Sequence, residues 1–183
     1  MESGAPELEW QSGRALIVVK DFACDRTLYR LKRGAFRVSE SDRNQARCVF
    51  VTGATSGIGL ATAGLLATSG FRVFGGVEPG EPTGRLAATR ATQVTIDVTD
   101  HASVLAARDE IARQTGTDAL WGLVNCAGVV AAGPVEMHDL DEARHVFDVN
   151  VLGVFATSQA FLPLIRRARG RIVNLSSLSG LLA

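Results

Sequence analysis

The stretch VTGATSGIG, residues 51–59, joins an apolar segment to a helical pattern. CVFVTG at 48–53 predicts a buried strand, and GIGLATAGLLATSG at 57–70 predicts a helix. Glycine permits positive φ and lets a ligand approach the backbone closely. The first turn of a helix offers free N–H groups and a partial positive charge. A glycine turn at this place therefore predicts nucleotide phosphate binding, with ordinary turn chemistry as the alternative.

After residue 47, apolar runs alternate with helical patterns, which is typical of βαβ units and a parallel sheet in an α/β fold. Asp100 is placed to cap a helix over 101–115 that stops at Gly116. Asp139 and Glu142 have capping-box spacing for one long helix towards residue 169, which Pro163 would bend late. Further strands are expected at 71–77, 93–100, 119–128 and 171–175.

Residues 1–47 lack this alternation. We expect a poorly ordered N-terminal extension there, or a start codon placed too far upstream. The basic stretch TLYRLKRGAFRV at 27–38 favours a second interpretation, an arm that binds a partner or a membrane surface. Residues 48–183 form the second expected region, the nucleotide-binding domain.

Composition limits the class of protein. With 183 residues we expect one folded domain, and 19 Lys+Arg against 19 Asp+Glu give no indication of nucleic-acid binding. Three cysteines without CxxC spacing predict free thiols, and three histidines without metal spacing predict solvated or capping roles and no metal site. No apolar run reaches the length of a membrane span, and ALIVV at 15–19 is too short for a signal sequence. We expect a cytoplasmic protein.

Five motifs occur in one order: TGATSGIG at 52–59, IDVTD at 96–100, NCAG at 125–128, VNVLG at 149–153 and IVNLSS at 172–177. In these motifs the chain resembles the short-chain dehydrogenase/reductase family, nearest to the D-β-hydroxybutyrate, retinol and 17β-hydroxysteroid dehydrogenase branch. The resemblance covers residues 48–183 in register. It implies a Rossmann-like, doubly wound parallel sheet in three αβα layers, of which the chain holds the first five strands of seven.

The resemblance also implies the residues around the cofactor. Asp97 would accept a hydrogen bond from the adenine amino group, with helix capping as the alternative, and Val98 would pack against the ring. Asn125 would tie neighbouring strands together, and Cys126 replaces the usual asparagine as a packing variation. The cofactor-binding set is Thr52, Gly53, Thr55, Ser56, Gly57, Ile58, Gly59, Glu78, Asp97, Val98, Asn125, Ala127 and Gly128.

The choice of cofactor follows from charge near the expected ribose. NADP sites carry a basic residue beside the glycine turn or just after the second strand. This chain has Thr55 and Ser56 in the first place and Glu78 after the second strand. A carboxylate repels a 2′-phosphate and can bind a free hydroxyl. The residues favour NAD, with NADP as the alternative.

The resemblance assigns catalytic roles to Ser177 and Asn150. Ser177 would hydrogen-bond the substrate oxygen, and Asn150 would bend its helix and order a water in the proton relay. The alternative for Asn150 is a buried core amide satisfied by backbone. The family's acid/base tyrosine and its lysine follow the serine, and the sequence ends at Ala183 before either. The one tyrosine, Tyr29, lies in the N-terminal extension.

The resemblance therefore implies an NAD(P)-dependent oxidoreductase that transfers hydride between a nicotinamide cofactor and a secondary alcohol or ketone. The alternative is a non-catalytic dinucleotide-binding or regulatory module. We expect the chain to be a C-terminally truncated piece of a homo-oligomeric parent, inactive alone. Its fifth strand should form an open sheet edge, and its long helix should leave apolar surface exposed.

Overall fold

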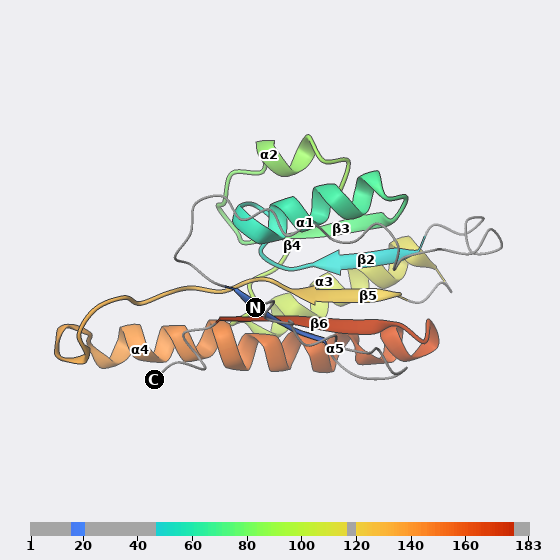
Figure 1. Ribbon diagram of the computed structural model, residues 1–183. Coiled ribbons are helices and arrows are strands. Elements are labelled where there is room, and N and C mark those ends of the chain that lie inside the picture. Colours follow the sequence, from blue (N-terminus) through green and yellow to red (C-terminus); the bar gives the residue numbers. More distant parts are fainter. Residues whose placement is uncertain (1–15, 21–46, 117–119, 178–183) are drawn as a thin grey trace, which may run out of the picture.

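The computed structural model describes residues 16–20, 47–116 and 120–177. Its centre is one sheet in which every neighbouring pair of strands is parallel, in the order β1-β6-β5-β2-β3-β4 (Figure 1). The strands are β1 (Leu16–Lys20), β2 (Cys48–Val51), β3 (Arg72–Val77), β4 (Thr92–Thr95), β5 (Gly122–Asn125) and β6 (Arg171–Ser177). The five expected strands and the parallel, Rossmann-like arrangement are confirmed.

β1 corrects one expectation from the sequence. It pairs in parallel with β6 from Leu16 opposite Val173 to Lys20 opposite Ser177. β6 is therefore an inner strand of the sheet, not the open edge that we expected. The remainder of the N-terminal extension and the stretch TLYRLKRGAFRV lie outside the described residues, so both interpretations of that segment stay predictions.

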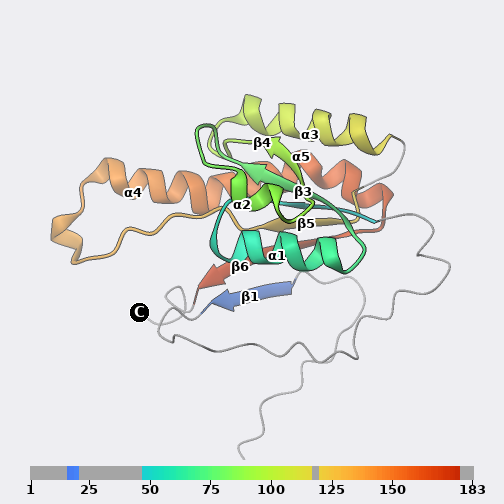
Figure 2. The ribbon, with the colours of Figure 1, turned by 90° about the horizontal axis from the view of Figure 1, so that it is seen from above.

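Helices cover both faces of the sheet, as Figure 2 shows from above. Alternate side chains of β2 point to opposite faces. Phe50 packs with residues of α3 and α5, and its ring centroid lies 4.9 Å from that of Phe161. Val49 and Val51 pack on the other face with Leu86 and with residues of α1. The expected three αβα layers are therefore present.

The helices are α1 (Gly57–Thr68), α2 (Gly84–Ala87), α3 (His101–Thr115), α4 (Leu140–Phe147) and α5 (Val154–Arg167), with a 3₁₀ turn η2 at Val135–Met137. Asp100 caps α3 by accepting a hydrogen bond from the backbone of Ala102, as expected. Asp139 likewise caps α4, but the Glu142 side chain bonds His138 and does not complete a capping box. α2 was not predicted.

The long helix expected over 139–169 is interrupted. A π-helical segment, η3 (Asp148–Gly153), joins α4 to α5. Gly153 lets Val98 approach this segment, because a Cβ added there would lie 2.8 Å from Val98 Cγ2. Phe147, Val151, Leu152 and Phe155 are exposed along the combined helix, which agrees with the exposed apolar surface that we expected.

Candidate functional site

A cleft lies at the carboxyl edge of the sheet, where β2 has β3 on one side and β5 on the other. Parallel α/β sheets bind ligands at this switch point. The cleft has a volume of about 710 Å³. It is lined by every predicted site residue except Thr52 and Asn125, namely Gly53, Thr55, Ser56, Gly57, Ile58, Gly59, Glu78, Asp97, Val98, Ala127, Gly128, Asn150 and Ser177.

The glycine turn between β2 and α1 forms the floor of the cleft. Gly53 has φ of 61°, and a Cβ on it would lie 2.8 Å from Ala127 Cα. A Cβ on Gly59 would lie 2.1 Å from the Gly53 carbonyl oxygen, so this glycine allows the turn to close on the helix. Gly57 has φ of 51°, and a Cβ there would meet nothing within 4 Å. Gly57 therefore borders open space in the cleft.

The amino end of α1 suits an anion. Its N-cap residue, Ser56, makes no side-chain capping hydrogen bond, and no acidic residue lies in the first turn. The partial positive charge of a helix N-terminus stabilises a negative group at this place. The turn and the helix together can hold a phosphate or pyrophosphate.

Thr52 and Asn125 lie behind the wall of the cleft, where they shape it. Thr52 is buried, and its Oγ1 accepts hydrogen bonds of 3.0 Å from the backbone N–H groups of Cys126 and Ala127. Asn125 is also buried and donates through Nδ2 to Asn174 Oδ1 at 2.7 Å and Ser158 Oγ at 3.1 Å. Asn125 thus ties β5 to β6 and to α5.

Asp97 follows β4 and lines the cleft. Its Oδ1 accepts hydrogen bonds from the backbone N–H of Thr99 at 2.8 Å and from Thr99 Oγ1 at 2.7 Å. These bonds, with the Thr99 hydroxyl as the largest cause, lower the pKa of the Asp97 carboxyl below its ordinary value. The cap of the next helix is Asp100, so the alternative role for Asp97 as that cap is wrong.

Asn150 lies in η3 and is exposed, so the expectation of a buried amide is wrong. Its Oδ1 accepts from the backbone N–H of Val129 at 2.9 Å, and its Nδ2 donates to the Val129 carbonyl at 2.8 Å. The amide therefore fixes the loop after β5 to the long helix, at the edge of the cleft.

The carboxyl end of β6 supplies Ser176 and Ser177 to the cleft. Cys126 also lines it, and burial raises the pKa of its thiol to about 12. A thiol with this pKa stays protonated at neutral pH and is a poor nucleophile, in line with the expected packing role.

Two ionisable residues of the cleft, Glu81 and His145, were missed from the sequence. Glu81 lies three residues after Glu78, and its backbone N–H bonds the Glu78 carbonyl, so the two carboxylates belong to one turn. His145, for which we expected a solvated or capping role, lines the cleft from α4. The spacing of 145, 149 and 150 on one helix was the available signal. Among the described residues, no group of three His, Cys, Asp or Glu side chains is placed to hold a metal ion.

One helical stretch in the described part of the chain, Leu140–Arg167, is long and apolar enough to cross a membrane by length and composition. The core helix of a globular protein passes the same test, and here Phe161, Leu164 and Ile165 are buried against the sheet. The expected absence of a membrane span stays a prediction.

The chain is similar to several known dehydrogenases. Retinol dehydrogenase 16 of Mus musculus is 39% identical over 140 residues, which cover 74% of this chain and 44% of that protein. The mitochondrial D-β-hydroxybutyrate dehydrogenase of Rattus norvegicus is 34% identical over 154 residues, which cover 79% and 45%. This chain thus spans about half the length of the curated relatives that it matches. These two relatives confirm the expected branch.

A solved structure with a similar fold is also that of a dehydrogenase. The ligand-free aldohexose dehydrogenase of Thermoplasma acidophilum superposes with a TM-score of 0.63 at 33% sequence identity, covering 73% of this chain and 50% of that one. The family model described as short chain dehydrogenase matches residues 47–183, which include every residue that lines the cleft. The chain therefore belongs to the short-chain dehydrogenase family.

Proposed function

We propose that the whole protein is an NAD(P)-dependent oxidoreductase that acts on a secondary alcohol or ketone. The observation that carries the proposal is the composition of one cleft, which joins a glycine turn at a helix N-terminus, a carboxylate after β4 and a serine pair at the end of β6. The two curated relatives described above are both dehydrogenases.

The cleft residues fit a dinucleotide in separate places. The turn from Gly53 to Gly59 would hold the pyrophosphate, since Gly57 borders open space and α1 begins there. Asp97 would accept from the amino group of the base, and its lowered pKa keeps it ionised at neutral pH. A bound nicotinamide supplies or takes up hydride. Ser177 would hydrogen-bond the substrate oxygen and stabilise the charge that develops on it.

Dinucleotide binding is tested with substitutions at two glycines that both have positive φ. Gly57 and Gly70 both have positive φ and open space around an added Cβ, but Gly57 lines the cleft and Gly70 follows the far end of α1. In calorimetry with NADH, Gly57→Val should abolish binding and Gly70→Val should keep it. Both variants should melt at similar temperatures. Equal affinity of the two variants for NADH would refute the assignment.

NAD preference is the finer part of the proposal. Glu78 and Glu81 are both exposed and both line the cleft on the side of β3. Two carboxylates near the adenosine ribose would repel a 2′-phosphate. We predict that NAD binds more tightly than NADP, and that Glu78→Arg narrows or reverses the difference. The control is Glu136→Arg, since Glu136 does not line the cleft. Wild-type preference for NADP in the same titration would contradict the prediction.

A further inference from the structure

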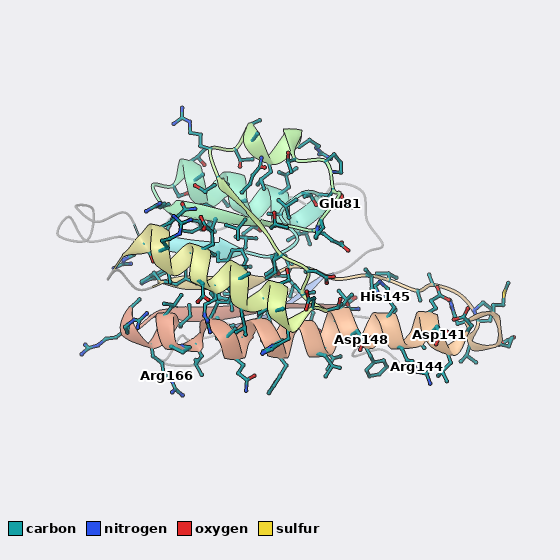
Figure 3. The ribbon with its side chains drawn as sticks, turned by 180° about the vertical axis from the view of Figure 1, so that it is seen from behind. Glu81, Asp141, Arg144, His145, Asp148 and Arg166 are labelled. Atoms are coloured by element: carbon teal, nitrogen blue, oxygen red, sulfur yellow. The ribbon has the colours of Figure 1, made fainter. Side chains whose placement is uncertain are left out.

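His145 occupies a place in the cleft that its sequence position does not reveal. It lies in the last turn of α4, one helical turn before Val149, and both residues line the cleft. Figure 3 shows His145 near the end of the sheet, and shows Arg144 and Asp141 on the same helix. Arg144 and Asp141 form an ion pair, and neither of them lines the cleft. α4 therefore directs His145 to the cleft and its charged neighbours to solvent.

His145 shares the cleft with Asp97, Val98 and Thr99, and the helical stretch that carries it passes Val98, because a Cβ added to Gly153 would lie 2.8 Å from Val98 Cγ2. The hydrogen bonds with Thr99 are the largest causes of the lowered pKa of Asp97, and an electrostatic effect of His145 is the smallest. β4, which leads to Asp97, is four strand positions from β6, which leads to Ser177. At the usual strand spacing this separation is roughly 19 Å. Asp97 is thus remote from the serine end, where substrate would react.

The composition of the cleft makes His145 distinctive. Its lining contains three carboxylates, Glu78, Glu81 and Asp97, and His145 is the one basic side chain among them. It is also the one side chain with an aromatic ring, since the other lining residues are aliphatic, small or polar. A flat base stacks on rings and on planar groups in preference to carboxylates. The aliphatic side chains of Ile96 and Val98 lie at the same end of the cleft.

We infer that the imidazole ring of His145 packs against the adenine base of the bound dinucleotide. This inference rests on the proposed function and deepens it, because it assigns a base-contacting residue on α4. His145 would cover the base while the Asp97 carboxylate accepts from its amino group. Part of the affinity for the adenosine half would then come from the helical stretch that continues to Asn150. The bound base would contact both the segment after β4 and α4.

The test compares the two halves of the cofactor. Calorimetry of the 183-residue chain would use NADH, ADP-ribose, which lacks the nicotinamide, and reduced nicotinamide mononucleotide, which lacks the adenosine. His145→Ala should weaken the affinity for ADP-ribose and for NADH by roughly five-fold or more. It should leave the affinity for the mononucleotide unchanged. His145→Phe, which keeps a ring, should restore the affinity for ADP-ribose, and Arg144→Ala on the same helix is the control with wild-type affinity.

Each other outcome overturns the inference. If the wild type binds NADH and His145→Ala binds ADP-ribose equally well, His145 does not contact the base, and the proposed function stands. If His145→Ala weakens the mononucleotide to the same degree, its effect is structural and not at the base. If the wild type binds none of the three compounds, the proposed function fails, and the inference fails with it.

Discussion

Thr52 illustrates at the scale of one residue how a buried hydroxyl shapes a site from behind. Its Oγ1 accepts two backbone hydrogen bonds from the loop after β5, which lies directly against the glycine turn at Gly53. The family motif contains this threonine, and the sequence alone predicted a cofactor contact for it. The contacts instead hold Cys126 and Ala127 against the end of β2.

We predict that Thr52→Val lowers the free energy of unfolding by about 2 kcal/mol or more, because two N–H groups lose their acceptor. Thr52→Ser keeps the oxygen and should retain most of the wild-type stability. Urea unfolding followed by circular dichroism measures both values. A larger loss in Thr52→Ser than in Thr52→Val would show that the methyl group, not the hydroxyl, matters.

His138 provides a pH-dependent interaction next to α4. Its Nδ1 lies 2.7 Å from Glu142 Oε2, and this hydrogen bond to the carboxylate raises the pKa of the imidazole above its ordinary value. A raised folded-state pKa stabilises the fold fully below the ordinary pKa of about 6.5, and the contribution is lost as pH rises through the folded-state value.

We predict that Glu142→Gln lowers the pKa of His138 in an NMR titration of the imidazole resonances. Asp141→Asn is the control, because Asp141 pairs with Arg144. Stability of the wild type should decline relative to Glu142→Gln as pH rises above about 6.5. An unchanged His138 titration in Glu142→Gln would contradict the assignment of the pair.

At the scale of elements, β1 is the largest difference from the sequence prediction. The run ALIVV at 15–19 is apolar and rich in β-branched residues, which was the available signal for a strand. The sequence on either side of this run lacks alternating strand and helix patterns, so the local pattern did not predict that the run joins the sheet. Pairing with β6, more than 150 residues later, gives the segment its structure. Long-range pairing of this kind is invisible to periodicity.

We predict that removal of residues 1–46 exposes β6 as a sheet edge. Amide hydrogens of β6 that face β1 should then exchange faster, while those of β3, which keeps both neighbours, should keep their protection. Mass-spectrometric hydrogen exchange on peptides that cover the two strands measures the difference. The shortened chain should also aggregate more readily. Unchanged exchange in β6 would show that β1 does not protect this edge.

At the scale of the whole molecule, we expect the 183 residues to bind the cofactor without catalysing turnover at an ordinary rate. The cleft gathers the glycine turn, Asp97 and Ser177 within residues 47–177. The family resemblance assigns acid/base work to a tyrosine and a lysine after Ser177, and the sequence contains one tyrosine, Tyr29, outside the described residues. Loss of a positioned acid/base costs about 10² to 10⁴ in rate.

We predict that the 183-residue chain binds NADH but reduces NAD at most very slowly with hydroxybutyrate, steroid alcohols or retinol. A longer product of the same gene that includes a downstream YxxxK motif should restore turnover. The wild-type chain bound to NADH in calorimetry is the positive control for folding. Turnover at ordinary enzyme rates from the 183 residues alone would contradict the prediction.

The sequence by itself determined the local elements of this protein. Strand and helix periodicity, the glycine turn and the caps at Asp100 and Asp139 depend on residues close together in the chain, so their pattern predicts them. It also indicated which residues border the cleft, because strands of a parallel sheet end at one edge.

Only the tertiary structure decided how distant segments meet. The tertiary structure pairs β1 with β6, bonds Thr52 to the loop after β5, links Asn150 to Val129 and brings His145 into the same cleft as Asp97. Each of these joins residues 21 or more positions apart. Such contacts depend on sheet order and helix packing. They exist because burial of two apolar cores stacks the layers in one arrangement, and no local pattern encodes it.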